Sequence, residues 1–319
     1  MREFSLIPDS ASTIASRVDL VTLFAIAIIV FFLSFIALNV LYFAVRYRRG
    51  NPADRENAPS HNDRLEMLWI VVPLIIAMVL FVWTSIVFFL QSDPPPDAST
   101  IYVVGKQWMW KVAHPEGKKE INELHVPLGR PVRLVLTSQD VIHDFYIPAF
   151  RVKVDAVPGR YTEMWFEATK VGTYRLFCAE YCGTYHSGMI GQVKVMDPVD
   201  YEAWLRENSA DTGYVPMAAE GEKLFVQYHC AGCHRESQVV KAPRLEGVYG
   251  HTVPIQNGKE VGFVIADDRY IRDSILLPKS QVVAGYEPLM PSYNDQIPEE
   301  DLLKIIEYIK SIGAKGVTE

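Results

Sequence analysis

The stretch CAEYCGTYHSGM, residues 178–189, says most about how the middle of this chain folds. Its donors are Cys178, Cys182, His186 and Met189. Thiolate and thioether sulfurs are soft ligands that select copper, whereas zinc has no use for a methionine and calcium and magnesium prefer oxygen. A buried cysteine pair beside a chance histidine is the alternative, but four ordered donors favour a metal. The pattern predicts a copper site, with zinc as the second choice.

A further donor lies upstream in the strand-like piece VIHDFYIP, residues 141–148, which contains His143. Two thiols four residues apart in one loop can bridge two metal ions. Each ion then has one histidine, and Met189 and a backbone carbonyl are left as weak outer ligands. The sequence therefore predicts a site with two metal ions.

A histidine on one strand followed by C-x-E-x-C-x-x-x-H-x-x-M on a loop resembles the dinuclear copper (CuA) domain of subunit II of the haem-copper oxidases. The resemblance implies that copper is bound by His143, Cys178, Glu180 through its main-chain carbonyl, Cys182, His186 and Met189. In that family the glutamate carboxylate also reaches a magnesium ion at the border with subunit I. The resemblance thus extends a possible second role, in binding magnesium, to Glu180.

Two long uncharged runs, residues 20–45 and 67–90, lie in the first part of the chain. Each exceeds the roughly 20 residues that a helix needs to cross about 30 Å of hydrocarbon. The first run is far longer than the apolar part of a secretory signal, and the second is too long for an ordinary buried helix. We expect a transmembrane hairpin within residues 1–97, with helices at about 18–46 and 65–91.

The segment between the two predicted helices is basic, and the flank after the second, QSDPPPD, is acidic. The basic residues are Arg46, Arg48, Arg49, Arg55 and Arg64. The positive-inside rule places this segment in the cytoplasm and both termini outside. We expect a bacterial inner-membrane protein whose soluble domains face the periplasm. The net charge of −7 argues against nucleic acid as a partner and fits docking to a basic protein.

Short alternating pieces separated by Gly, Pro and Asp follow the hairpin, which predicts an antiparallel all-β sandwich or barrel. The copper resemblance narrows this to a cupredoxin-like Greek-key domain over residues 98–200. Within it, QWMW at residues 107–110 matches the aromatic signature of the family, in which the first tryptophan helps electrons reach the copper. Trp108 has this role by resemblance, whereas Trp110 is better explained as a core aromatic.

The second apolar run is preceded by an acid, in the sequence EMLWIVVP at residues 66–73. This resembles the family pattern E-x-x-W-x-x-x-P. In relatives the glutamate lies near the inner mouth of a proton channel of subunit I, which makes Glu66 a candidate for proton uptake. An equally good explanation is an acid favoured by the dipole of a helix N-terminus.

A connecting segment, residues 201–215, leads to a third module at residues 216–319, which contains the C-x-x-C-H run CAGCH. This run is the attachment sequence of c-type haem. Cys230 and Cys233 can reach both vinyl groups, and His234 then faces the iron. A thioredoxin-like dithiol is the rival interpretation, but it follows a strand in an α/β pattern, whereas helical residues surround this run.

Other residues of the third module resemble an all-α class I cytochrome c. Gly221 and Phe225 match the positions through which such proteins pack their first helix against their last, here expected at residues 298–313. Pro243 resembles the loop proline whose carbonyl holds the axial histidine, and Met290 is the expected sixth iron ligand. All four cysteines then serve cofactors, which leaves no disulfide framework.

The order of the modules resembles subunit II of a cytochrome c oxidase with a fused cytochrome c domain. The resemblance implies that electrons pass from an external cytochrome or similar donor through haem c and two coppers to subunit I, where oxygen is reduced to water and protons are pumped. The implied partners are subunit I, subunit III, the donor and the lipid bilayer. A quinol oxidase subunit is disfavoured because such relatives lack the copper ligands. The alternatives are the electron-transfer subunit of a copper-containing nitric oxide reductase and a membrane-tethered electron carrier.

Overall fold

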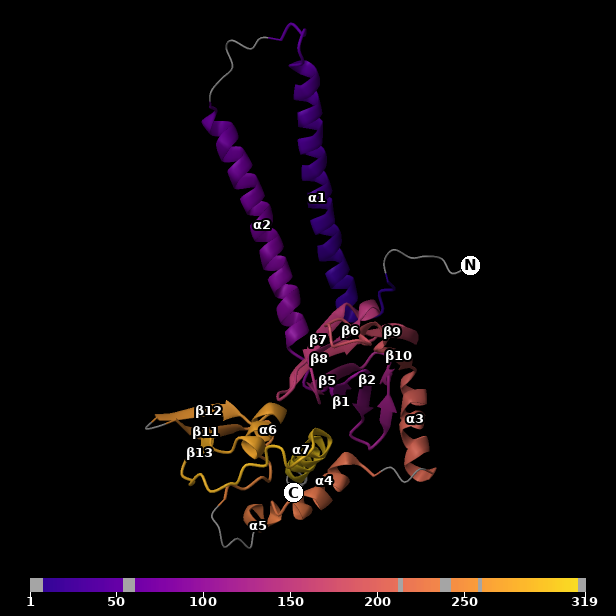
Figure 1. Ribbon diagram of the computed structural model, residues 1–319, viewed down its shortest axis with the longest axis vertical. Coiled ribbons are helices and arrows are strands. Elements are labelled where there is room, and N and C mark those ends of the chain that lie inside the picture. Colours follow the sequence, from indigo (N-terminus) through magenta and orange to yellow (C-terminus); the bar gives the residue numbers. More distant parts are fainter. Residues whose placement is uncertain (1–7, 54–60, 212–214, 236–241, 258–259, 315–319) are drawn as a thin grey trace.

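The computed structural model describes residues 8–53, 61–211, 215–235, 242–257 and 260–314. Two long helices extend from one side of a β-domain, and a smaller C-terminal domain lies on the side of the β-domain away from the helices (Figure 1). The three parts follow one another along the chain, in the order that the sequence predicts.

The two long helices are α1, Thr13–Arg46, and α2, Asp63–Ser92. Both are long and apolar enough to cross a membrane, and most of their large hydrophobic side chains are exposed. Their side chains meet near the β-domain at Phe24 and Trp83, whose ring centroids lie 5.6 Å apart.

Helix α1 begins five residues earlier than the sequence suggested, because its first turn belongs to the β-domain. The side chain of Ser12 accepts a hydrogen bond from the amide of Ala15 and donates one to the carbonyl of Phe150. Ile14 and Ala15 are buried, and Arg151 pairs with Asp19. These contacts fix the base of the helix to the β-domain.

The β-domain is a sandwich of two five-stranded sheets, in the orders β3-β2-β1-β5-β8 and β4-β10-β9-β6-β7. Nine of the ten strands pair with at least one antiparallel neighbour. The pairs β1 with β5 and β10 with β4 are parallel, so the sandwich is mixed at these two places and not antiparallel throughout. The strands are β1 Ser99–Lys106, β2 Met109–Ala113, β3 Lys119–Ile121, β4 Glu123–Pro127, β5 Pro131–Ser138, β6 His143–Ile147, β7 Val152–Ala156, β8 Thr162–Glu167, β9 Gly172–Cys178 and β10 Ile190–Met196.

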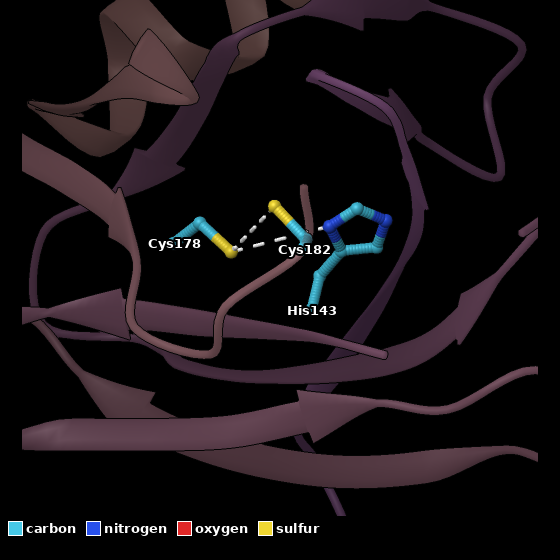
Figure 2. Close-up of side chains that lie close together, drawn as sticks. All are labelled: His143, Cys178 and Cys182. Atoms are coloured by element: carbon cyan, nitrogen blue, oxygen red, sulfur yellow. Dashed lines mark hydrogen bonds between the residues drawn. The ribbon is translucent and has the colours of Figure 1, made fainter. Parts of the chain in front are cut away.

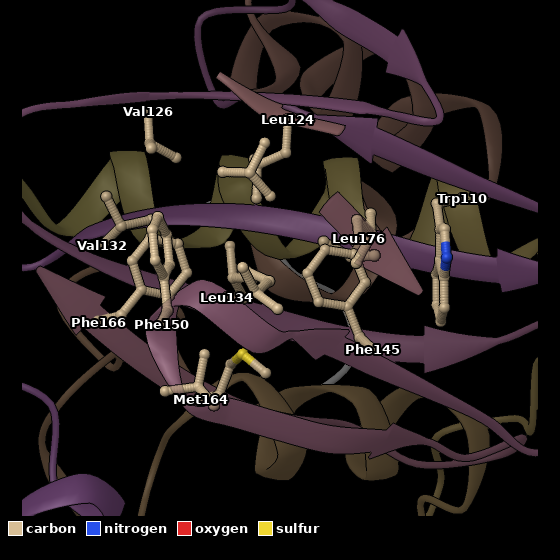
Figure 3. Packing of buried hydrophobic residues seen from close by; sticks show 14 of the residues in the cluster. Trp110, Leu124, Val126, Val132, Leu134, Phe145, Phe150, Met164, Phe166 and Leu176 are labelled. Carbon is tan, nitrogen blue, oxygen red and sulfur yellow. The ribbon is translucent and has the colours of Figure 1, made fainter. Parts of the chain in front are cut away.

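Alternating apolar side chains of the two sheets interdigitate to form the core of the sandwich (Figure 3). Trp110 is fully buried and packs edge-on against Phe145, with ring centroids 4.9 Å apart. This confirms Trp110 as a core aromatic. Two short 3-10 helices, η1 Pro148–Phe150 and η2 His186–Gly188, complete the domain.

Helix α3, Pro198–Asp211, follows the last strand and covers one end of the sandwich. The ring of Trp204 stacks on His125 at 4.3 Å, and Nζ of Lys118 lies 3.4 Å from the centre of the same indole. Most of the segment expected to be a linker is therefore a helix docked on the β-domain.

In the C-terminal domain, α4 crosses α7 at Gly221, where a Cβ atom would lie only 1.9 Å from the carbonyl oxygen of Lys304. The rings of Phe225 and Tyr308 meet beside this crossing at 5.2 Å. A small sheet in the order β12-β11-β13 is added to the predicted helices. The elements are α4 Met217–Gln227, α5 Ala231–His234, β11 Thr252–Asn257, β12 Glu260–Ile265, α6 Asp268–Leu276, β13 Val282–Val283 and α7 Glu299–Ala314.

Candidate metal centre and haem site

The predicted copper ligands come together where two adjacent strands of the second sheet meet a loop. His143 is the first residue of β6 and Cys178 the last of β9, and the pairing of Phe145 with Cys178 brings these strand ends side by side. Cys182 belongs to the following loop. Figure 2 shows the two thiols and the imidazole of His143 directed toward one another.

Each thiol of this cluster has one imidazole beside it. The sulfurs of Cys178 and Cys182 lie 3.7 Å apart; Nδ1 of His143 is 3.9 Å from the first, and Nδ1 of His186 is 3.5 Å from the second. The Met189 sulfur lies 3.9 Å from the Cys182 sulfur. The two cysteines are free thiols, so the cluster is a set of donors and not a disulfide.

The main-chain carbonyl of Glu180 accepts a 3.2 Å hydrogen bond from the Cys178 thiol, while the residue as a whole is exposed. The main-chain oxygen of Glu180 therefore faces the thiol cluster, while its exposed carboxylate is free to bind another group. All six predicted copper ligands thus lie in one place. Soft sulfur donors, with only imidazole and carbonyl groups beside them, fit copper better than a hard cation.

The two thiols differ in acidity. Burial by itself would raise the pKa of Cys178, but its contact with His143 and nearby backbone amides lowers that pKa to about 7. Burial and the neighbouring Cys178 raise the pKa of Cys182 to about 12. Metal binding must therefore displace a proton from Cys182, which makes loading of the site favourable at higher pH.

Two residues to which the sequence analysis gave no role, Asp140 and Gln107, hold predicted copper ligands in place through hydrogen bonds. Nε2 of His143 donates to the carboxylate of Asp140 at 2.8 Å. The other oxygen of Asp140 accepts from the backbone amide of Gln107, and the Gln107 side chain donates to the carbonyl of Cys182, each at 2.8 Å. Such contacts fix the tautomer and orientation of a metal-binding histidine. The sequence signal that could have pointed to this contact is the position of Asp140, three residues before His143.

Trp108 lies against the loop that carries the second thiol. Its ring is 6.0 Å from that of Tyr185, and a Cβ on Gly183 would lie 3.3 Å from its Cζ2 atom. Glu66, in contrast, lies near the start of α2, where its amide donates to the carbonyl of Asn62. This is the end of α2 far from the β-domain (Figure 1).

The predicted haem ligands surround a cavity of about 370 Å³ in the C-terminal domain. Nδ1 of His234 donates to the carbonyl of Pro243 at 2.9 Å, which leaves Nε2 as the ligand atom. The wall is mainly apolar and is formed in part by α6 and α7. It includes Cys230, Cys233, His234, Pro243 and Met290. Two thiols and an imidazole in the wall of an apolar cavity fit a covalently attached haem.

A second group of metal-binding residue types, Glu120, Glu123 and His125, lies under α3. The carboxylate of Glu120 accepts hydrogen bonds from His114 Nε2 at 2.9 Å and from His125 Nδ1. Burial would raise the pKa of Glu120, but these two imidazoles lower it to about 2. His114 and His125 are buried core residues here, and Tyr201 contacts His114 at 3.2 Å. The group is a hydrogen-bond network that anchors α3.

Comparison with known proteins decides the family. The family model of the periplasmic domain of cytochrome c oxidase subunit II matches residues 118–196, that of its transmembrane domain matches residues 3–86, and that of cytochrome c matches residues 218–313. Cytochrome c oxidase subunit 2 of Alkalihalophilus pseudofirmus is 30% identical over 92% of this chain and 85% of its own length. The chain belongs to the cytochrome c oxidase subunit II family.

Cytochrome c oxidase subunit 2 of Thermostichus vulcanus is 31% identical over 64% of this chain and 79% of its own length. The crystal structure of the periplasmic domain of cytochrome oxidase subunit II from Bradyrhizobium japonicum is 34% identical, with a TM-score of 0.36, and covers 39% of this chain and all of that one. The predicted family and fold class are confirmed. The protein is a membrane-anchored oxidase subunit that carries a cytochrome c domain and serves electron transport.

Proposed function

We propose that this subunit accepts electrons from an external cytochrome or similar donor at its haem domain. The electrons pass by way of its copper domain to the haem-copper site of subunit I, where oxygen is reduced to water and protons are pumped. The observation that carries the proposal is the pair of thiols 3.7 Å apart, each beside one imidazole. The alternatives are a nitric oxide reductase subunit and a free tethered carrier, and the experiments below distinguish them from the proposal.

The copper domain would hold two copper ions. The thiolates of Cys178 and Cys182 would hold the two ions together with His143, His186, Met189 and the Glu180 carbonyl. When bound, such a pair supplies a centre that gains and loses one electron. The residues around it hold the ligands still: Asp140 orients His143, and Gln107 orients the loop at Cys182. Ligands that are held in place move little when the copper centre gains or loses an electron, which favours fast electron transfer.

The haem domain would hold one c-type haem, attached through Cys230 and Cys233. His234 and Met290 would hold the haem iron, and the Pro243 carbonyl would fix the tautomer of His234. A methionine sulfur raises the reduction potential of haem iron relative to a second histidine. The haem domain is thereby suited to accept electrons from a donor outside the complex.

Several roles follow from the family pattern. Trp108, beside the copper loop, would admit electrons from a donor that reaches the copper domain directly, and the Glu180 carboxylate would bind magnesium at the border with subunit I. Glu66 would aid proton uptake at the inner membrane surface, with the arginine-rich segment in the cytoplasm and both soluble domains in the periplasm. Subunit III is a further expected partner.

Optical and EPR spectra of the purified chain test the two centres. The proposal requires a low-spin c-type haem and a mixed-valence signal from two coppers, together with two coppers per iron by metal analysis. Absence of the mixed-valence signal in protein that retains its haem would contradict it.

Purification of the complex tests the assignment to an oxidase. The subunit should copurify with a large haem-rich subunit, and the complex should consume oxygen. Consumption of nitric oxide but not oxygen would favour the reductase, and isolation of the chain without a partner would favour a tethered carrier.

A further inference from the structure

The haem domain packs on the outer face of the first sheet of the copper domain. Four aromatic or aliphatic side chains of this face are at most 5% exposed. They form one continuous hydrophobic cluster with residues that line the haem cavity, among them Phe225, Ile271 and Ile305. The four side chains are Tyr102, Val104, Val135 and Tyr161. The cavity is thus connected to the copper domain by tightly packed side chains.

A buried acid fixes this contact. Asp268, at the start of α6, is fully buried and pairs with Lys310 of α7 at 2.7 Å and with Arg133 of β5 at 3.0 Å. It also accepts hydrogen bonds from Tyr249 at 2.8 Å and from Tyr102 of β1 at 3.2 Å. A buried charge is tolerated only where such partners are in place, so the two domains meet in one defined orientation.

Strand β1 connects this contact to the copper ligands. Side chains alternate along a strand, so Tyr102 and Val104 face the haem domain while Val103 lies in the copper-domain core. The next residue, Gly105, touches a copper ligand: a Cβ on it would lie 2.9 Å from Cδ2 of His143. Val104 therefore contacts the haem domain, and Gly105, the residue after it in β1, contacts the copper site.

A chain of hydrogen bonds also links the haem domain to Gly105. The carboxylate of Glu300, at the start of α7, accepts from Nζ of Lys111 at 2.6 Å and from the side chain of Gln139 at 3.2 Å. The backbone amide of Gln139 in turn donates to the carbonyl of Gly105 at 2.9 Å. Both connections from the haem domain thus converge on Gly105, beside His143.

From these contacts we infer that β1 is the internal electron route, which leads from the haem domain through Val104 and Gly105 to His143. Trp108 serves only donors that approach the copper domain from outside. The inference rests on the proposed function. In each transfer, one electron leaves the haem iron, which is oxidised from the ferrous to the ferric state. The copper pair is reduced by that electron, and no bond is made or broken.

Three variants test this route in the full chain with both cofactors: Val104→Ala, Val135→Ala and Trp108→Phe. Val104→Ala opens a gap at the point where β1 meets the haem domain. Val135→Ala is its matched control, because it removes the same atoms from the same interface on the neighbouring strand β5. After flash reduction of the haem, its reoxidation by the copper centre is followed optically.

We expect reoxidation to be several-fold slower in Val104→Ala and unchanged in Val135→Ala and Trp108→Phe. Copper EPR spectra and the potentials of both centres should match the parent in all three. Hydrogen exchange of the β1 amides should show that the domains remain docked. Trp108→Phe should slow only reduction by a donor that bypasses the haem.

Equal slowing in the two valine variants would overturn the inference, because it would mean general loosening of the interface. Slowing in Trp108→Phe without slowing in Val104→Ala would likewise overturn it and place the internal route at the tryptophan. If the parent protein itself showed no transfer between the two loaded centres, the proposed function would be wrong.

Discussion

Nε2 of His143 donates a 2.8 Å hydrogen bond to the carboxylate of Asp140, three residues earlier in the chain. The bond leaves Nδ1 of the imidazole directed at the Cys178 sulfur, 3.9 Å away. One carboxylate thereby selects the nitrogen that is offered to a metal. The same carboxylate accepts a hydrogen bond from the Gln107 amide, so the orientation of His143 is linked to the turn that contains Gln107 and Trp108.

Replacing this carboxylate should weaken copper binding without removing a ligand. We expect Asp140→Asn to lower copper affinity about 10- to 100-fold, the usual effect of losing a partner that orients a metal-binding histidine. Copper retained during titration with a chelator measures the change, and Asp97→Asn, an exposed acid outside the cluster, is the control. Unaltered retention in Asp140→Asn would show that the bond does not support the site.

The bridging role proposed for Cys182 predicts that its replacement removes copper but not haem. Cys182→Ser should abolish the two-copper centre and leave the haem intact, because a hydroxyl is a poor bridging ligand for copper and the two sites belong to different domains. Metal analysis and EPR measure the loss. A variant that kept two coppers and the mixed-valence signal would show that Cys182 is not a bridge.

The proposed axial ligand Met290 would keep the haem potential high enough for an external donor to reduce it. In Met290→His the haem should stay attached, but its potential should fall, because a second histidine stabilises ferric iron. Redox titration measures the drop. Turnover with the natural donor should decrease, whereas a strongly reducing donor that reaches the copper directly should restore much of it. Undiminished turnover with the natural donor, despite the lower potential, would mean that electrons bypass the haem.

The helix crossing in the haem domain leaves no room for a side chain. Gly221→Ala places a methyl group 1.9 Å from the Lys304 carbonyl, so α4 and α7 must separate. We expect a loss of about 1–3 kcal/mol in haem-domain stability, typical of overpacking. Thermal melting followed at the haem bands measures it. Gly262→Ala, where the new methyl would be 3.6 Å from Ile255, should melt like the parent.

The network under α3 predicts an acid-sensitive contact. The pKa of Glu120 is lowered from 4.5 to about 2, so its stabilising effect is complete above pH 4.5 and is lost as the pH falls toward 2. In Glu120→Gln the stability of the copper domain should fall less steeply over this range. Thermal melting at a series of pH values checks this, with Glu167→Gln as the control; an unchanged slope in Glu120→Gln would contradict it.

Local patterns were enough to predict the copper loop, the haem attachment run and the two long helices, because their residues lie close together in the chain. The contact of His143 with the loop depends on the pairing of β6 with β9. The sequence offered His143 as a further donor, and the family resemblance made it a copper ligand. The His114–Glu120–His125 network was missed, because its members become neighbours only when β2, β3 and β4 assemble. The buried role of Asp268 could not be predicted from the sequence either, because its partners come from both domains.

The burial of Asp268 also bears on how fast the subunit can work. A haem domain held only by a flexible tether would have to search for its acceptor before each electron, and its rate would depend on solvent viscosity and tether length. A domain fixed through Arg133, Lys310 and Tyr102 has completed that search when the protein folds. Diffusion then limits only the arrival of the external donor.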